Sequence, residues 1–501
     1  MSRRSLALAV LSGCLLAASL PGPGYSFLAW FSLVPLLIAL RGLSVRSGLL
    51  LSFVFGLAFF CGTVSWVFNS IHVHGRVPLL TASIITFLFC CALALFFAPF
   101  GAAVVHVRTT RPGLVFLAAP AVWTALELSR THLFSGFPWM LSGYSQYRML
   151  PIIQIADVAG VYGISFIIVL VNISIVELIS IRKRFALLLT TSVVLIAVLA
   201  YGYYRMSAHT GNGAITVTVV QGNIDQDKKW DPAHQSEVIA TYKRLTLKAV
   251  EQKPDLVIWP ETATPFYFEG PHQPLTDDLR KFVRSSGNPL IFGSPTYENK
   301  DRRLLRNSAF LLDRDGMTKA VYHKVHLVPF GEYVPLKKSL LFFVDKIVQA
   351  SEDFQAGSKN TLMMVRIRQG NEVAIGAVIC YEIIFPGLVR GFVNSGATIM
   401  ANITNDAWFG RTSAPYQHFS MAVFRAVENR VPIARAANSG ISGFIDSTGR
   451  ILATSNIFTE ACLTRSLTPS ATRTFYTRYG DVFAYLCSLA GLLLVALPLK
   501  E

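Results

Sequence analysis

The sequence predicts a multi-span α-helical membrane domain joined to an α/β layered sandwich domain outside the cytoplasm. Three observations predict this fold class. Hydrophobic residues make up 52% of the 501-residue chain and charged residues only 15%, with a mean hydropathy of +0.47. Apolar runs long enough to cross a bilayer occur in the first 210 residues and again at the end. Residues 211–478 contain no such run, and strand patterns alternate there with helix patterns.

Eight apolar runs are predicted as membrane spans. They cover residues 6–20, 27–40, 48–68, 79–107, 113–128, 155–179, 185–203 and 482–499. The first two are short and share the turn sequence PGPG, which indicates a tight helical hairpin. We therefore expect residues 1–210 to form a transmembrane domain of seven spans, residues 211–478 to form the α/β domain, and residues 479–501 to form a C-terminal transmembrane helix.

The distribution of Lys and Arg among the loops predicts the orientation in the membrane. An even number of spans places both termini on one side. The loops on that side carry Arg3, Arg4, Arg41, Arg46, Arg108, Arg111, Arg182, Lys183, Arg184 and Lys500, and the opposite short loops carry Arg76, Arg130 and Arg148. Because the cytoplasmic side carries the excess of basic residues, both termini are predicted to be cytoplasmic and residues 211–478 extracytoplasmic. This topology explains much of the net charge of +16, so nucleic acid is not expected as a partner.

Cysteine usage argues against a metal centre. Five of the seven cysteines lie in predicted spans, and only Cys380 and Cys462 fall within residues 211–478. The sequence has no CxxC pair and no His/Cys cluster at metal-ligand spacing, so no metal is predicted. An oxidising compartment permits a bond between Cys380 and Cys462, but we expect both thiols to be free.

Residues 127–163 form an unusual stretch of the membrane half, with the sequences GFPW, GYSQ and GVYG. One interpretation is an aromatic belt at the membrane interface with a polar loop. The other is a re-entrant or surface loop that shapes an entrance for lipid. Asp157 and Asn172 are costly at membrane depth, so we expect them to face protein or a water-filled cavity.

The α/β domain shows a succession of short strand and helix patterns. Strands are predicted at residues 214–221, 256–259, 290–293, 308–313, 318–323, 373–379, 398–402, 432–435, 443–446 and 451–453, and helices at 232–251, 386–394 and 418–430. This alternation is typical of a layered α/β sandwich.

Three reactive side chains follow the ends of three apparently buried strands: Glu261, Lys324 and Cys380. If those strands neighbour one another in one sheet, the three side chains meet at one edge, where α/β folds bind ligands. A thiol with an ordinary pKa near 8.5 becomes a good nucleophile when a base takes its proton. Glu261 can be that base, and Lys324 can stabilise an oxyanion that develops on an attacked carbonyl.

The motifs around these residues resemble those of a known family. WPET (residues 259–262), YHKVHLVPFGEYVP (322–335) and CYEIIFP (380–386) are similar to the Glu-Lys-Cys motifs of the nitrilase superfamily. Within it, the chain resembles the apolipoprotein N-acyltransferase family of the bacterial cytoplasmic membrane. The resemblance includes the eight-span arrangement, the stretch at residues 136–166, and NITNDAWFG, APYQH and RAANSG.

The resemblance implies an α-β-β-α nitrilase-like sandwich and specific roles for residues. Cys380 would be the nucleophile, Glu261 the general base and Lys324 the oxyanion stabiliser. The supporting and substrate-binding residues would be Glu332 and Glu382 as carboxylates that orient the lysine and the amine, Tyr381 beside the nucleophile, Trp230 and Phe409 on arms over the cleft, and Asn223.

The activity that the resemblance implies is acyl transfer in lipoprotein maturation. A membrane phospholipid would donate an acyl chain to Cys380 as a thioester, and the amine of an S-diacylglyceryl cysteine at the start of an apolipoprotein would accept it. No cofactor is expected, and the protein is expected to be a monomer of the inner membrane with a periplasmic catalytic domain.

Two other classes of function stay open at this point. A membrane-anchored amidase of the nitrilase type would hydrolyse a small amide, and it would need neither the GFPW…GYSQ stretch nor an apolar cleft. A transporter or scaffold would have no reason to place Glu261, Lys324 and Cys380 at three strand ends.

Overall fold

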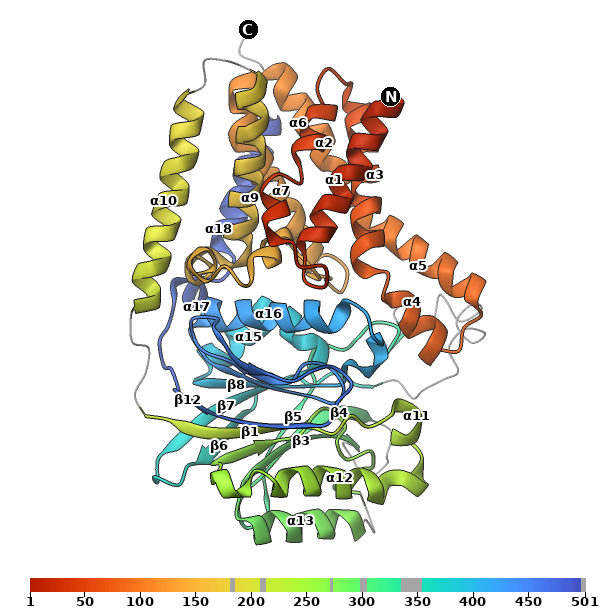
Figure 1. Cartoon of the computed structure of the whole chain (residues 1–501), viewed down its shortest axis with the longest axis vertical. Helices are drawn as coiled ribbons and strands as arrows, with labels where there is room; N and C mark the ends of the chain where they lie inside the picture. Colours follow the sequence, from red (N-terminus) through yellow and green to blue (C-terminus); the bar gives the residue numbers. More distant parts are fainter. Residues whose placement is uncertain (181–184, 208–212, 271–273, 298–303, 335–353, 497–501) are drawn as a thin grey trace. The chain divides into compact units, whose positions relative to one another are not determined.

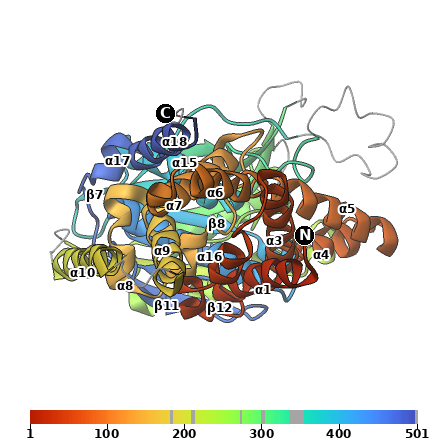
Figure 2. The same cartoon turned by 90° about the horizontal axis from the view of Figure 1, so that it is seen from above.

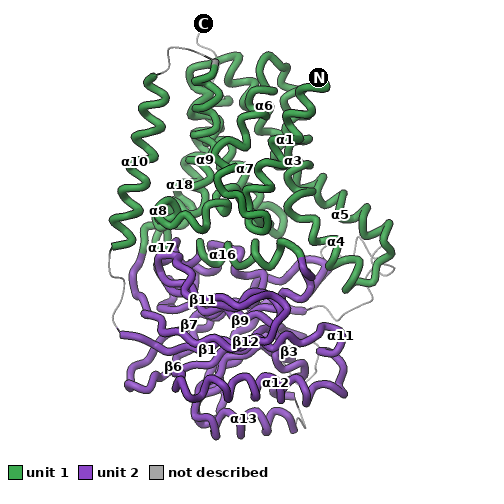
Figure 3. Tube along the Cα trace, in the orientation of Figure 1, with its two compact units in different colours: residues 1–208, 412–424, 474–501 green, residues 209–411, 425–473 purple. Residues whose placement is uncertain are grey.

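The computed structural model describes residues 1–180, 185–207, 213–270, 274–297, 304–334 and 354–496. They form two compact units (Figure 3). The helical unit comprises residues 1–208, 412–424 and 474–501, and the sandwich unit comprises residues 209–411 and 425–473. Residues 412–424 thus group with the helical unit, although the sequence places them inside the segment 211–478.

The helical unit is built from apolar helices. They are α1 (Arg3–Ser19), α2 (Val34–Ala39), α3 (Val45–Val64), α4 (Val67–Asn69), α5 (Leu79–Ala94), α6 (Ala98–Thr110), α7 (Val115–His132), α8 (Leu150–Ile153), α9 (Ala156–Ser180), α10 (Phe185–Ser207), α17 (Phe475–Tyr479) and α18 (Val482–Ala496). Helix α16 (Ala414–Asn429) begins in this unit and ends in the sandwich unit.

Five helical stretches of the described residues are long and apolar enough to cross a membrane. They are Val45–Val64, Leu79–Thr110, Pro112–His132, Ala156–Ile179 and Phe185–Ser207. Two shorter apolar stretches, Ser26–Ala39 and Val482–Ala496, and helix α1 coincide with the other three predicted spans. The predicted total of eight spans stays a prediction.

The helical unit presents apolar side chains outward. Leu80 and Leu88 of α5 are exposed, as are Ile196 of α10 and Leu492 of α18. Helix α10 packs on α8 and α9 at the edge of the unit (Figures 1 and 2). Outward leucine and isoleucine on helices that satisfy their own backbone hydrogen bonds suit a hydrocarbon surrounding. The unit is therefore built to lie in a membrane.

The GFPW…GYSQ stretch is buried inside the helical unit, which agrees with neither an exposed aromatic belt nor a surface loop. Trp139 is fully buried, and its Nε1 donates to Oε1 of Gln417 at 2.7 Å. Ser142 donates from its main-chain N and its Oγ to Oε1 of Glu127, at 2.7 and 2.6 Å. These bonds satisfy polar groups that would be costly in hydrocarbon.

The two isolated polar residues at membrane depth face protein, as predicted. Asp157 accepts hydrogen bonds from Tyr201 and Arg205, both at 2.7 Å. The amide of Asn172 accepts from the main-chain N of Leu33 at 2.8 Å and donates to the carbonyl of Ala29 at 2.9 Å. Both residues are thus hydrogen bonded within the helical unit.

The sandwich unit contains two six-stranded sheets. The first has the strand order β12-β1-β2-β3-β4-β5 and the second β11-β10-β9-β8-β7-β6. The strands are β1 (Ile215–Gln221), β2 (Leu256–Ile258), β3 (Leu290–Tyr297), β4 (Leu305–Leu312), β5 (Thr318–His323), β6 (Leu362–Arg366), β7 (Glu372–Ile379), β8 (Ile399–Thr404), β9 (Ile433–Ala437), β10 (Gly443–Ile445), β11 (Ile451–Thr454) and β12 (Ala461–Leu467).

The two sheets pack face to face. Strand β1 contacts β9, β4 contacts β7, and β5 contacts β6 across the sandwich. Helices α12 (Gln235–Leu247) and α13 (Pro274–Ser286) cover the outer side of the first sheet (Figure 1), where Tyr242 and Val283 join a core with Phe292 and Phe310. Helix α15 (Pro386–Asn394) packs on β7 of the second sheet. The predicted α-β-β-α sandwich is confirmed.

The elements of the sandwich unit that were not predicted include β6, β12 and α13. Each carries few buried side chains, because β6 and β12 are edge strands and α13 buries only Leu279 and Val283. The predicted helix at 232–251 is shorter, since a 3-10 turn (Pro232–His234) precedes α12 and another (Val250–Gln252) follows it.

Candidate active site

The strand β2 leads into the segment that carries Glu261. Trp259 directly after the strand is fully buried, and its Nε1 donates to Oγ1 of Thr246 at 2.9 Å. Gly293 of β3 lies so close to this segment that a Cβ at that position would be 2.5 Å from the main-chain N of Thr262. The absent side chain at Gly293 therefore lets the Glu261 segment lie against the first sheet.

Lys324 and Cys380 follow their strands without an intervening residue, because β5 ends at His323 and β7 ends at Ile379. The condition that the three strands neighbour one another in one sheet is wrong. Strands β2 and β5 are separated by β3 and β4, and β7 belongs to the second sheet. The side chains approach one another because the two sheets pack face to face.

Glu261, Lys324 and Glu332 form a buried charged cluster with Asn307. The Nζ of Lys324 lies 2.9 Å from Oε1 of Glu332 and 3.6 Å from Oε1 of Glu261. The amide of Asn307 donates to Oε1 of both carboxylates, at 2.8 Å for Glu261 and 2.9 Å for Glu332. The other oxygen of Glu261 accepts from the main-chain N of Asn405 at 2.9 Å. Donors on both oxygens fix the orientation of the Glu261 carboxylate.

The ammonium of Lys324 is held in its charged form. The side chain is only 1% exposed. Burial acts to lower the pKa of Lys324, but the carboxylates of Glu332 and Glu261 outweigh it and raise that pKa. A buried cation with fixed position is the kind of group that stabilises an oxyanion.

Cys380 occupies a strained backbone position at the end of β7. Its φ is +51°, in the left-handed region that residues other than glycine seldom adopt. The side chain is buried, and burial followed by the charge of Glu261 raises the pKa of the thiol, while Lys324 and a hydrogen bond with Thr404 lower it. The thiol therefore needs a neighbouring base to become a thiolate, and Glu261 carries the charge that acts on it most strongly.

Glu382 links the strand of Cys380 to the segment after Lys324. Its Oε1 accepts from the main-chain N of Val325 at 2.7 Å and of His326 at 3.0 Å, and its Oε2 accepts from the main-chain N of Ile379 at 2.8 Å. Burial raises the pKa of Glu382 to about 7, and these hydrogen bonds and Lys324 oppose the shift. Glu382 thus holds the backbone directly after Lys324.

Comparisons with known proteins cover nearly the whole chain. The family profile described as the apolipoprotein N-acyltransferase N-terminal domain matches residues 12–174, and the carbon-nitrogen hydrolase profile matches residues 216–476. The apolipoprotein N-acyltransferase of Geobacter metallireducens is 42% identical over 509 residues, which cover 100% of this chain and 96% of that protein. The chain belongs to the apolipoprotein N-acyltransferase family.

Two further relatives with the same name show similar coverage. The Haemophilus influenzae protein is 33% identical over 97% of this chain and 93% of its own length. The Methylococcus capsulatus protein is 34% identical over 95% of this chain and 93% of its own length. The match to this acyltransferase family therefore includes both the helical unit and the sandwich unit.

Two of the aromatic residues predicted around the site lie in the segments of Lys229 and Asn405, which bind Glu261. Trp230 is 47% exposed and directly follows α11 (Gln226–Lys229). Phe409 is half-buried and is the last residue of the 3-10 helix Asp406–Phe409. This helix begins directly after Asn405. Tyr381, directly after Cys380, packs edge-to-face on Phe385, with ring centroids 5.1 Å apart.

Asn223 has a backbone role in the structure. Its φ is +50°, a conformation that asparagine tolerates better than most residues, and its main-chain N donates to the carbonyl of Asn438 at 2.8 Å. This turn accounts for an asparagine after β1. The predicted part of Asn223 in substrate binding stays a prediction.

Three residues that contact Glu261 were missed by the sequence interpretation: Asn307, Asn405 and Lys229. Asn307 lies inside β4, Asn405 follows β8, and Lys229 ends α11. Asn405 lies in NITNDAWFG, a motif that carries the family resemblance but does not indicate a contact with Glu261. Nothing marks Asn307 or Lys229 in the sequence, because amides and lysines in such patterns are common on surfaces.

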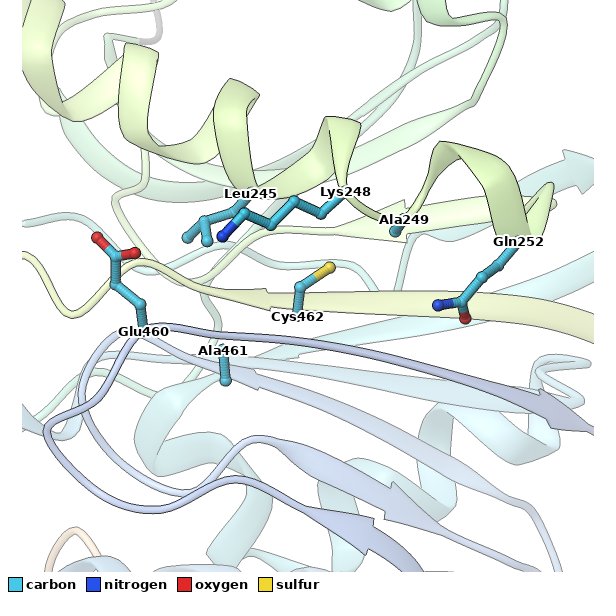
Figure 4. A pocket seen from close by; sticks show the side chains of 7 residues that line it. All are labelled: Leu245, Lys248, Ala249, Gln252, Glu460, Ala461 and Cys462. Carbon is cyan, nitrogen blue, oxygen red and sulfur yellow. The ribbon is translucent and has the colours of Figure 1, made fainter.

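Cys462 lies in a separate pocket of the sandwich unit (Figure 4). The pocket is lined by Leu245, Lys248, Ala249, Gln252, Glu460, Ala461 and Cys462. No disulfide joins Cys380 to Cys462 in the structure. Burial raises the pKa of the Cys462 thiol to about 11, with Lys248 opposing the shift, so this thiol is a poor nucleophile at neutral pH. Among the described residues, no group of three His, Cys, Asp or Glu side chains could hold a metal ion.

Proposed function

We propose that this enzyme transfers a fatty acyl chain from a membrane phospholipid to the N-terminal amine of S-diacylglyceryl-cysteine in apolipoproteins, through a thioester on Cys380. The observation that carries the proposal is the buried arrangement of Glu261, Lys324 and Glu332, with the Glu261 charge acting on the Cys380 thiol, in a chain of this family. The roles of individual residues below are part of the proposal.

In the first half-reaction, Cys380 attacks the ester carbonyl of the phospholipid. Glu261 accepts the thiol proton, and a bond forms between Sγ and the carbonyl carbon. The oxyanion that develops is stabilised by the ammonium of Lys324, whose position is fixed by Glu332 at 2.9 Å. The carbon–oxygen ester bond then breaks, and Glu261 returns its proton to the departing oxygen. The products are a lysophospholipid and an acyl-enzyme.

In the second half-reaction, the lipoprotein amine attacks the thioester carbonyl. Glu261 accepts a proton from the amine, Lys324 stabilises the second oxyanion, and the carbon–sulfur bond breaks. The proton returns to the sulfur of Cys380, so the enzyme regains its starting state. Exchange of an oxygen ester for a thioester is roughly balanced and formation of an amide is downhill, so the reaction balances without a cofactor.

The supporting residues have distinct proposed tasks. Glu332 and Glu382 hold Lys324 and its backbone, and Tyr381 lies next to the nucleophile. Trp230, Phe409 and Asn223 contribute to binding of the lipid substrates. Membrane-embedded helices in the same chain keep the reaction at the bilayer, which avoids exposing acyl chains to water at about 0.8 kcal/mol per CH₂.

A direct assay tests the proposed function. Purified enzyme in mixed vesicles receives phospholipid labelled in an acyl chain and a synthetic diacylated lipopeptide with a free N-terminal amine. We expect the label to appear in the lipopeptide through an amide bond, and a lipopeptide with an acetylated N-terminus to remain unlabelled. Release of free labelled fatty acid with no labelled lipopeptide would contradict acyl transfer. The amidase alternative is not favoured, because hydrolysis of a small amide does not explain why residues 12–174 match the apolipoprotein N-acyltransferase N-terminal domain.

We further propose that the protein lies in the bacterial inner membrane as a monomer, with both termini in the cytoplasm and the sandwich unit in the periplasm. The support for this orientation is the excess of basic residues in the loops on one side of the membrane. A reporter that is active only outside the cytoplasm should be active when fused after Gly213 and inactive when fused after Arg46 or Arg184. A cytoplasmic reporter should show the opposite pattern, and the reverse result at all three positions would overturn this orientation.

A further inference from the structure

A second buried lysine lies at the proposed active site. Lys229 is the last residue of α11 and is fully buried, between the exposed residues Lys228 and Trp230. Its Nζ donates to the main-chain carbonyl oxygen of Glu261 at 3.0 Å. Because burial of an ammonium is costly unless it finds a partner, a lysine at this position needs a reason beyond packing.

A second set of hydrogen bonds connects α11 to Glu261. Oε1 of Gln226, the first residue of α11, accepts from Nδ2 of Asn405 at 2.8 Å. The main-chain N of Asn405 donates to Oε2 of Glu261 at 2.9 Å. Helix α11 is therefore hydrogen bonded to the backbone of Glu261 at one end and, through Asn405, to the carboxylate of Glu261 at the other.

The charges around Lys229 give it an electrostatic role as well. Burial lowers the pKa of Lys229 to about 8, while Glu261 and Cys380, the titratable groups that face it, act in the opposite direction. Cys380 in turn is faced by Glu261, Lys324 and Asp406. Below pH 8, Lys229 thus adds a positive charge beside the base and the nucleophile, and above pH 8 it loses this charge.

We propose that Lys229 is a positioning residue for acyl transfer: its Nζ holds the backbone of Glu261, and its positive charge stabilises the thiolate of Cys380. This inference rests on the proposed function, in which Glu261 takes the proton of Cys380. Trp230 directly follows Lys229, so an exposed aromatic residue lies next in sequence to the lysine that binds Glu261.

The test compares Lys229→Met with the wild-type enzyme over a range of pH. The readouts are the rate at which labelled phospholipid acylates Cys380 without an acceptor, and the rate at which iodoacetamide alkylates Cys380. Below pH 8 we expect Lys229→Met to be about tenfold slower in both, because a charge lost near the thiol moves its ionisation upward by about one pH unit. Above pH 8 the wild-type rate should approach that of the variant.

Three further variants make the test specific. Lys228→Met removes a charge from the neighbouring exposed lysine and should behave as the wild type. Lys229→Arg keeps the charge and should retain most of the rate. Lys229→Gln keeps a hydrogen-bond donor without a charge, so it should fold even if Lys229→Met does not. Its acylation and alkylation rates should still lack the change near pH 8 that the charge of Lys229 causes.

The outcomes separate this inference from the proposed function. If the ratio of wild-type to Lys229→Gln rates is the same at every pH, Lys229 has only a structural role and the inference is overturned. A lower midpoint of thermal unfolding in the variants, with an unchanged pH profile, leads to the same conclusion. Normal acyl transfer by Cys380→Ala would overturn the proposed function itself, whatever the Lys229 variants do.

Discussion

Incubation of the enzyme with phospholipid labelled in its acyl chain, without an acceptor, should leave one fatty acyl group on Cys380. Neutral hydroxylamine should release it, since hydroxylamine cleaves thioesters and leaves amides intact, and mass spectrometry should place it on the peptide with Cys380. Cys380→Ala should abolish this acylation and lower transfer to the lipopeptide by at least about 10³-fold, as expected when a covalent nucleophile is removed.

The matched control is Cys462→Ser. Cys462 is the other cysteine of the sandwich unit, but it lies in a separate pocket, and burial keeps its pKa well above neutral pH. This variant should form the acyl-enzyme at the wild-type rate. Label on Cys462, or full transfer activity in Cys380→Ala, would contradict the role of Cys380 as nucleophile.

The strands with buried apolar runs could be predicted from the sequence, and the edge strands could not. The run before Cys380 and the alternating run of β1 were recognised because most of their side chains are buried. In β12 the pattern is masked by polar and exposed residues, such as Arg465 and Ser466. Strand β12 pairs with β1 in the register Ile215↔Leu467, a pairing between distant segments that no local pattern indicates.

Glu261, Lys324 and Cys380 were recognised because each follows a strand, whereas Glu332 was named only through the family resemblance. Their geometry was not predictable, because the sequence gives no sign that β7 lies in a second sheet stacked on the first. The residues that complete the cluster lie in segments whose sequence pattern does not indicate a functional site. Asn307 lies within a strand and Lys229 in a short polar helix, and only the fold brings both to Glu261. Positions at strand ends could therefore be predicted, whereas Asn307 and Lys229, which bind Glu261, could not.

The second large effect is expected for Lys324→Met. The ammonium of Lys324 lies 2.9 Å from Glu332 and 3.6 Å from Glu261, where methionine matches its length but has no charge. Formation of the acyl-enzyme should be slower by about 10²–10³-fold, the usual effect of removing an oxyanion stabiliser. Lys319→Met is the matched control, because Lys319 lies on β5, the strand that Lys324 follows, is half exposed and pairs only with Asp313 at 3.6 Å among the described residues.

A comparison of two reactions of Cys380 separates the oxyanion role of Lys324 from a general loss of structure. Acylation passes through an oxyanion, whereas alkylation by iodoacetamide displaces iodide and forms none. Lys324→Met should therefore slow alkylation much less than acylation, the remaining loss arising because Lys324 also lowers the pKa of the thiol. An equal loss in both reactions would mean that Lys324 acts on the thiol alone. Acylation at the wild-type rate would remove Lys324 from the mechanism.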